Sequence, residues 1–134
     1  VVVLHLSGLD LRKIIERQVH NAGRRAGFSG MRVFVRCERG HMDVRMVLAD
    51  GREIADSDTL RVIANDFIAL GGDEVLTPVM PEGGCEVQMN TPLVRDVLAG
   101  GFRARGGRLR ADQFLDAANR RWNLPDSIPA NCAL

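Results

Sequence analysis

A segment near the middle of the chain constrains the fold most, because an apolar strand there runs into an aromatic residue and a pair of glycines. Residues 60–63 have the apolar, β-branched character of a strand, and Phe67 follows just past its end. Gly71 and Gly72 come next, directly followed by Asp73. Because glycine adopts positive φ and lets a ligand approach the backbone, this pattern predicts a strand that ends in a recognition loop.

Phe67 and Asp73 have the side chains that a nucleoside site needs. A flat apolar ring with a hydrogen-bond acceptor beside it suits a nucleobase and its sugar. The alternative is structural, since a Phe after a strand is usually part of the core and Gly-Gly-Asp is usually only a turn. Spacing alone favours this structural alternative.

Periodicity and turn residues predict an α+β domain, with a mixed or antiparallel sheet flanked by helices. We expect strands over residues 1–6, 31–37, 42–49 and 60–64, with a hairpin connection over residues 38–41. Ser7 and Asp10 predict a capping box at the start of a helix that ends near residue 20. The apolar stripe of this helix consists of Leu11, Ile14, Ile15 and Val19. Residues 21–30 are expected to form a loop.

The last third of the chain is expected to contain two helices. Thr91 as N-cap and Pro92 in the first turn predict a helix through residue 98, which Gly100 and Gly101 weaken beyond that point. A last helix is expected over residues 111–122, where Pro125 forbids much continuation. Its inward-facing residues would be Phe114, Leu115, Ala118 and Trp122.

Composition fits a single domain over residues 1–134. The chain is 46% hydrophobic and 26% charged, which allows a real core. The sequence has no run of eighteen apolar residues, so it predicts no membrane span. With 18 basic and 17 acidic residues, the net charge of +1 argues against a nucleic-acid partner that depends on a broad positive field. The scattered histidines and cysteines lack metal-ligand spacing, so we expect no metal bound by this chain.

Residues 63–73 resemble the N-x-F-(I/L)-A-x-G-G-D-G signature of the C-terminal domain of the 5'-nucleotidase family. Residues 3–16 are similar to the strand, glycine turn and helix that come earlier in that domain, and residues 28–33 to the start of its hairpin. Residues 50–54 and 59–65 resemble two further segments in the same order. The resemblance runs from about Val3 to Asp73, and its Gly-Gly-Asp piece is the specific part.

This resemblance implies that the chain is most of the nucleoside-binding domain of a two-domain phosphohydrolase. In the family, an N-terminal domain holds two divalent metals and the catalytic His-Asp pair, so it would be the partner of this chain and would hold the catalytic residues. Carried over, Phe67 would stack on the base of a nucleotide, Asp73 would accept hydrogen bonds from the ribose, and Asn65 would support the loop. The predicted substrate-binding residues are Phe67, Asp73, Asn65, Gly71, Gly72 and Phe28.

Phe28 and Glu74 depart from the family pattern. Phe28 is the nearest candidate for a second stacking ring, but it is out of register with the family's second aromatic. Glu74 stands where the signature has its last glycine, which adds a negative charge beside Asp73.

The resemblance also implies a periplasmic or extracellular protein, because members of the family are usually exported. In an oxidising compartment we expect one disulfide. Cys85, in a glycine-flanked loop, is the best placed to pair with Cys37 or Cys132.

Two alternatives to a nucleotidase remain open. The parent protein could share the architecture and act on sugar-nucleotides, cyclic nucleotides or sulfur compounds. In the second alternative the chain is a binding or structural module without a catalytic partner, and Phe67 belongs to its core.

Overall fold

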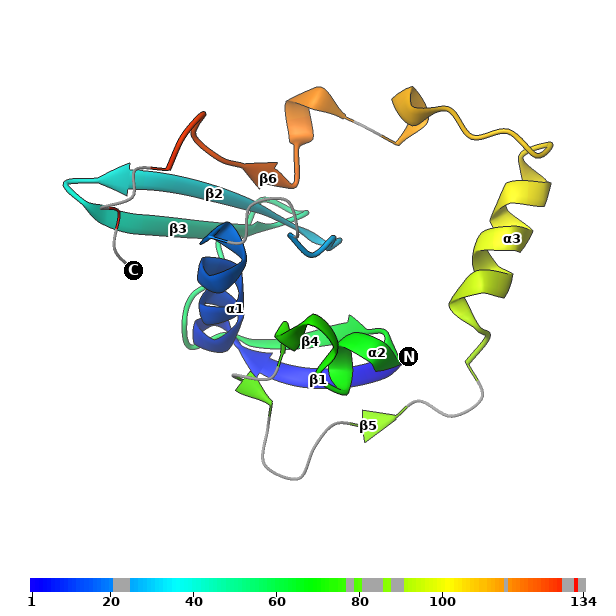
Figure 1. The fold of residues 1–134 in the computed structure, drawn as a ribbon, viewed down its shortest axis with the longest axis horizontal. Coiled ribbons are helices and arrows are strands. Elements are labelled where there is room, and N and C mark those ends of the chain that lie inside the picture. Colours follow the sequence, from blue (N-terminus) through cyan, green and yellow to red (C-terminus); the bar gives the residue numbers. More distant parts are fainter. Residues whose placement is uncertain are drawn as a thin grey trace.

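The computed structural model describes residues 1–20, 25–76, 79–80, 86–87, 91–114, 116–128 and 132. The first half of the chain contains the longer strands and helix α1, while the second half has short elements around one longer helix (Figure 1). In chain order they are β1 (Val2–Ser7), α1 (Gly8–His20), β2 (Met31–Glu38), β3 (His41–Leu48), β4 (Thr59–Ala64), α2 (Asp66–Ala69), η1 (Gly72–Glu74), β5 (Glu86–Val87), α3 (Val94–Ala104), η3 (Ala111–Gln113), η4 (Ala117–Asn119) and β6 (Trp122–Asn123).

The described strands form two separate three-stranded sheets. In the first, β1 lies between β4 and β5 and pairs antiparallel with both. In the second, β2 pairs antiparallel with β3 and parallel with β6. The predicted α+β class with mixed and antiparallel sheets is therefore confirmed.

Helix α1 lies between the two sheets (Figure 1). Its predicted stripe is buried, and the stripe divides between two cores. Leu11, Ile15 and Val19 pack with apolar residues of β2 and β3, whereas Ile14 packs with β1 and the segment after β4. Burying apolar surface on both sides fixes the helix as the central layer of the domain.

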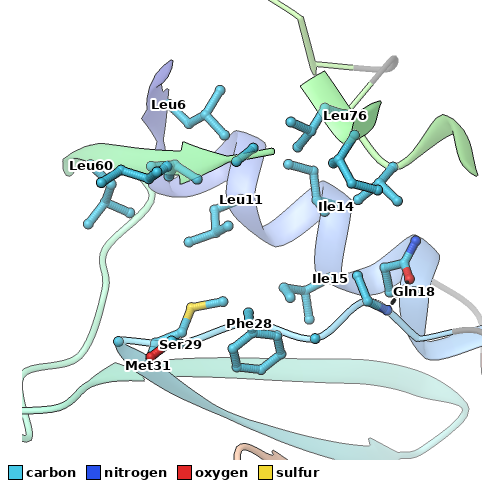
Figure 2. Close-up of a pocket in the computed structure, with 18 of the residues that line it drawn as sticks. Leu6, Leu11, Ile14, Ile15, Gln18, Phe28, Ser29, Met31, Leu60 and Leu76 are labelled. Carbon is cyan, nitrogen blue, oxygen red and sulfur yellow. Dashed lines mark hydrogen bonds between the residues drawn. The ribbon is translucent and has the colours of Figure 1, made fainter. Parts of the chain in front are cut away.

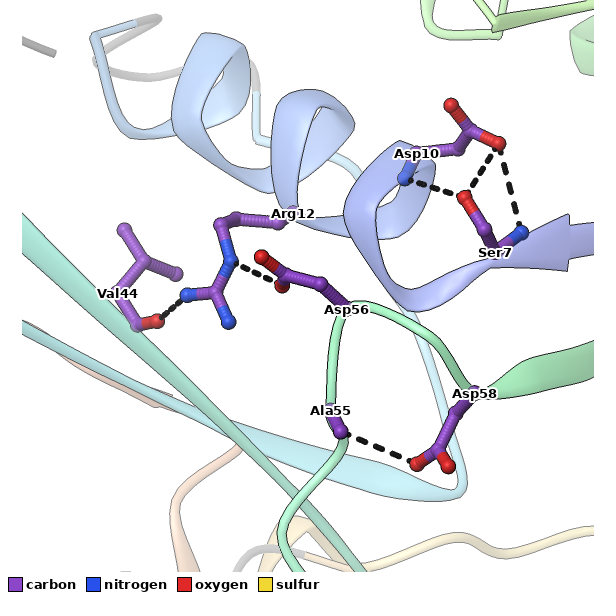
Figure 3. Close-up of polar contacts among 7 residues, drawn as sticks. All are labelled: Ser7, Asp10, Arg12, Val44, Ala55, Asp56 and Asp58. Carbon is purple, nitrogen blue, oxygen red and sulfur yellow. Dashed lines mark hydrogen bonds and ion pairs between the residues drawn. The ribbon is translucent and has the colours of Figure 1, made fainter.

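The start of α1 is defined by the predicted capping box. The Asp10 backbone N–H donates to Ser7 Oγ at 3.1 Å, and the Ser7 hydroxyl donates to the Asp10 carboxylate at 2.6 Å (Figure 3). At Gly8, a Cβ would lie 1.9 Å from the carbonyl oxygen of Ala55, so only glycine fits beneath the loop that crosses there. This loop is further held by the Arg12 guanidinium, which donates to Asp56 at 2.8 Å and to the Val44 carbonyl of β3.

The hairpin between β2 and β3 is tighter than the sequence predicts. The pairing of Glu38 with His41 leaves only Arg39 and Gly40 in the turn, at φ of 53° and 83°. Two consecutive positive φ values match a two-residue type I′ turn, whose twist suits the flanking strands. The predicted loop that precedes β2 is confirmed over residues 25–30, and residues 21–24 lie outside the described part.

The predicted last helix over residues 111–122 is wrong. The chain forms the short turns η3 and η4 there, and then strand β6. The Asp116 carboxylate accepts from the Ala118 backbone N–H at 2.9 Å, a local bond that competes with helix continuation. Trp122 then pairs with β2, where the Val33 N–H donates to the Arg121 carbonyl at 2.7 Å. Leu115 lies outside the described residues.

Helix α3 also differs in its limits. It begins at Val94, with Leu93 as its N-cap, rather than after the expected cap at Thr91. It continues past Gly100 and Gly101 to Ala104, and Gly106 and Gly107 follow at positive φ. Positive φ at glycine is the usual way in which a helix ends.

A disulfide joins Cys37 of β2 to Cys132, with the two Cα atoms 6.0 Å apart. The expected pairing through Cys85 is therefore wrong, and Cys85 itself lies outside the described residues. Strand β6 pairs parallel with β2, and the disulfide holds Cys132 against the same sheet, because Cys37 pairs with Met42 of β3. No helix among the described residues is long and apolar enough to cross a membrane.

Candidate functional site

The segment that follows β4 folds into one short helix and a tight turn. Asn65 caps helix α2, and its Oδ1 accepts the backbone N–H of Ile68 at 2.8 Å. Ala69 is buried in the core beside β1, and Val75 and Leu76 are buried there after the turn. Both ends of the turn are thus anchored in the same apolar core, and the capping role agrees with the expected support from Asn65.

Gly71 and Gly72 have different physical roles in this turn. Gly71 takes a φ of 100°, which residues with a side chain rarely adopt. Gly72 is needed for space, because a Cβ there would lie 2.5 Å from Cδ1 and Cε1 of the Phe67 ring and from the Phe67 carbonyl oxygen. The Phe67 ring therefore lies directly against the backbone of the glycine pair.

Phe67 is not a core residue. The residue is 60% exposed, although Ala69, two positions further on, is buried. The structure thus contradicts the structural alternative in which Phe67 packs in the core. A ring with one edge fixed on a glycine turn and the rest open to solvent has a free surface for stacking.

Asp73 and Glu74 complete the turn in the left-handed region. Both have a φ of 53°, a conformation that non-glycine residues adopt at a cost of about 1–3 kcal/mol. The Asp73 carboxylate is exposed, and none of the described side chains donates a hydrogen bond to it. Its two oxygens are free to accept hydrogen bonds from a ligand.

Glu74 is tied to helix α1 by an ion pair. Arg17 Nη2 lies 2.7 Å from the Glu74 carboxylate. From the sequence, Glu74 was expected only to add a negative charge beside Asp73. The ion pair with Arg17 of α1, which compensates this charge, was not predicted. The only sequence feature that could have indicated this ion pair is Arg17 on the solvent side of α1. No sequence pattern relates it to Glu74, which lies 57 positions away.

Phe28 lies elsewhere, at an apolar cleft of about 590 Å³ beside α1 (Figure 2). The ring of Phe28 packs edge-on against Trp122, with ring centroids 5.0 Å apart. Phe28, Trp122 and Asn65 line this cleft, and Phe67 does not. Five of the six predicted site residues thus lie within residues 65–73, whereas Phe28 lines the cleft that only Asn65 among those five also lines.

The polar content of this cleft is low. Apolar side chains of α1, β1, β2 and β4 line much of the cleft, among them Leu6, Leu11, Met31 and Leu60 (Figure 2). The Gln18 side chain, which is buried, is already used, because its Oε1 accepts the Ala26 backbone N–H at 2.9 Å. The cleft therefore suits an apolar group better than a sugar or a phosphate.

Residues 1–80 match the sequence profile of the family described as "5'-nucleotidase, C-terminal domain". The chain belongs to this family. The matched range includes both central sheet strands, helix α1 and the whole turn from Asn65 to Glu74. No curated protein and no solved structure matches the chain significantly.

The part of the chain that matches the 5'-nucleotidase C-terminal domain family is the part that contains the hydrophobic cores. The matched range holds the two buried cores, whereas residues 81–134 lie beyond it and contain the exposed helix α3. A family of C-terminal domains implies a partner N-terminal domain. Among the described residues, no group of three or more His, Cys, Asp or Glu side chains could hold a metal ion.

Proposed function

We propose that this chain is the nucleotide-recognition domain of a 5'-nucleotidase-like metallophosphohydrolase. The observation that carries the proposal is the Phe67 ring, held on Gly72 and 60% exposed, beside the free carboxylate of Asp73. These groups lie within the range that matches the family profile. An exposed ring beside an acceptor is the arrangement that a base and its ribose require.

In this proposal the chain binds and orients the nucleotide, and the reaction belongs to the complete protein. Phe67 stacks on the base, and Asp73 accepts hydrogen bonds from the ribose hydroxyls. Two divalent metals in the N-terminal domain would supply an activated water for attack on the phosphorus. Binding energy from the nucleoside, which does not react, positions the phosphate and so sets KM and specificity.

The disulfide supports a periplasmic or extracellular location. A bond between Cys37 and Cys132 persists in an oxidising compartment and is rare in reducing ones. This agrees with an exported hydrolase that acts on nucleotides outside the cytoplasm.

A second candidate keeps the architecture and changes the substrate. Phe28 packs on Trp122 at the cleft rather than on Phe67, so the described residues offer the base one ring and not two. A one-sided stack restricts the base less than a sandwich does. Sugar-nucleotides and cyclic nucleotides, which share the base and ribose, are therefore the alternative substrates.

Calorimetric titration of the complete protein with adenosine tests the proposal. Phe67→Leu keeps an apolar side chain but removes the ring, and should weaken binding about 5-fold to 200-fold, corresponding to roughly 1–3 kcal/mol of stacking. Leu70→Ala is the matched control, because Leu70 lies in the same turn and is 79% exposed. Unchanged affinity in Phe67→Leu, or equal losses in both variants, would contradict the proposal.

A further inference from the structure

Helix α3 has an apolar stripe that nothing in the described structure covers. Val94, Val97, Leu98 and Phe102 recur at the spacing of one helix face, and none of them is buried. Leu98, at the centre of the stripe, is 67% exposed. Figure 1 shows α3 standing apart from both sheets. A helix with one apolar face ordinarily buries that face against a partner.

The cleft beside α1 has the matching chemistry. Its wall contains Leu60 and Val62 of β4 together with Met31 of β2, all of which are only partly buried. Ile68 of α2 also lines it, so the cleft reaches the segment from Asn65 to Glu74, which we call the recognition turn. An apolar hollow of about 590 Å³ can receive several side chains of one helix face.

The connections on both sides of α3 permit this docking. On the N-terminal side, strand β5 pairs with Val2 of β1, and β4 lies on the other side of β1, about 9–10 Å from β5. The linker over residues 88–93 can span about 20–25 Å when extended, which exceeds that separation. On the C-terminal side the chain returns to Trp122, which itself lines the cleft.

We propose that α3 docks into this cleft and buries its stripe against β4, β2 and α1 of the same chain. The C-terminal tether ends at Trp122 in the wall of the cleft, and the N-terminal tether ends two strands from β4, so the effective concentration of the helix there is far above that of a second copy. Docked α3 would contact Ile68, which lines the cleft, but not Phe67, which does not. It would therefore support the turn that holds Phe67. The docking stands on packing alone and does not depend on the proposed nucleotide site.

Photo-crosslinking in the complete protein tests where α3 lies. Leu98 is replaced by p-benzoylphenylalanine, which reacts readily with methionine and aliphatic C–H bonds, and the adducts are mapped by mass spectrometry. We expect intramolecular adducts to peptides that contain Met31 or Leu60. The matched control carries the same probe at Arg103, on the opposite face of the helix, and should give few of them. Adducts to a second copy or to another domain, or equal yields from both positions, would overturn the proposal.

A charge placed on the stripe gives an independent readout. Leu98→Arg keeps helix propensity but cannot enter an apolar cleft, so the melting temperature should fall by several degrees and binding of the dye ANS should rise. Gly100→Arg is the control, since a Cβ at Gly100 meets nothing within 4 Å. It should not lower the melting temperature. Equal melting temperatures for Leu98→Arg and the wild-type protein would overturn the proposal.

Discussion

At the scale of single residues, position 72 of the recognition turn has no room for a side chain. A Cβ at this position would lie 2.5 Å from two ring atoms and the carbonyl oxygen of Phe67. Gly72→Ala must therefore displace either the ring or the turn, and we expect a loss of about 1–3 kcal/mol in unfolding free energy. In the proposed function, KM for the nucleotide should rise as well.

Chemical denaturation and steady-state kinetics on the complete protein check this prediction. Gly100→Ala is the control, because its Cβ would meet nothing within 4 Å and alanine is the better helix former. If Gly72→Ala matched the wild-type protein in both stability and KM, the contact between Gly72 and Phe67 would not matter.

Asp10 carries a predicted pH dependence. The Ser7 hydroxyl, which donates to its carboxylate, holds the pKa of Asp10 below its ordinary value. A pKa that is lower in the folded state stabilises the protein above the unfolded pKa of about 3.9, and this contribution is lost as the pH falls through the folded pKa.

Ser7→Ala should therefore be less stable than the wild-type protein at pH 7, and the difference should shrink below about pH 4. Denaturation curves at pH 7, 5, 4 and 3 measure it. Ser29→Ala, at an exposed serine, should show no such pH dependence. A constant difference for Ser7→Ala at every pH would show that the cap acts without the charge of Asp10.

At the scale of elements, α1 begins directly against the loop at Ala55. A Cβ on Gly8 would lie 1.9 Å from the Ala55 carbonyl oxygen, and this is backbone that a side-chain rotation cannot move. Gly8→Ala should cost about 3 kcal/mol or more, at the upper end of overpacking effects. Gly27→Ala, where the added atom meets nothing within 4 Å, should leave the melting temperature nearly unchanged. Similar melting temperatures for the two variants would contradict this geometry.

Local patterns predicted the first half of the chain well. The Ser7–Asp10 box, the stripe of α1 and the strand before Phe67 all depend on residues a few positions apart, and all are found. The helix expected over residues 111–122 failed because Trp122 pairs with β2, nearly ninety positions earlier in the chain. The pairing of Cys37 with Cys132 and the Arg17–Glu74 ion pair are long-range in the same way, and spacing does not encode them.

The grouping of the candidate site residues also depends on local sequence. Asn65, Phe67, Gly71, Gly72 and Asp73 are consecutive enough to be recognised as one turn, and the structure holds them together. Phe28 was grouped with them by resemblance, but its ring packs on Trp122 at the cleft. Only tertiary packing decides the position of Phe28.

At the scale of the whole molecule, the disulfide joins the C-terminal segment to β2. The bond between Cys37 and Cys132 closes a loop of 95 residues, for which loss of the bond typically costs about 2–5 kcal/mol. Cys132→Ser should lower the melting temperature and remove the dependence of melting on reductant. In Cys85→Ser, a non-reduced peptide map should still show Cys37 joined to Cys132. A cross-linked peptide that contains Cys85 in the wild-type protein would contradict the assigned pairing.

The central claim is that the Phe67 turn binds the nucleoside part of the substrate. Its most direct test compares KM of Phe67→Ala and wild-type complete enzyme on a nucleoside monophosphate and on a small phosphate ester that lacks a nucleoside. Removing a stacking ring costs about 1–3 kcal/mol, so KM for the nucleotide should rise roughly 5-fold to 200-fold, while hydrolysis of the small ester hardly changes. Equal loss on both substrates, together with a large drop in melting temperature, would contradict the claim and return Phe67 to a structural role.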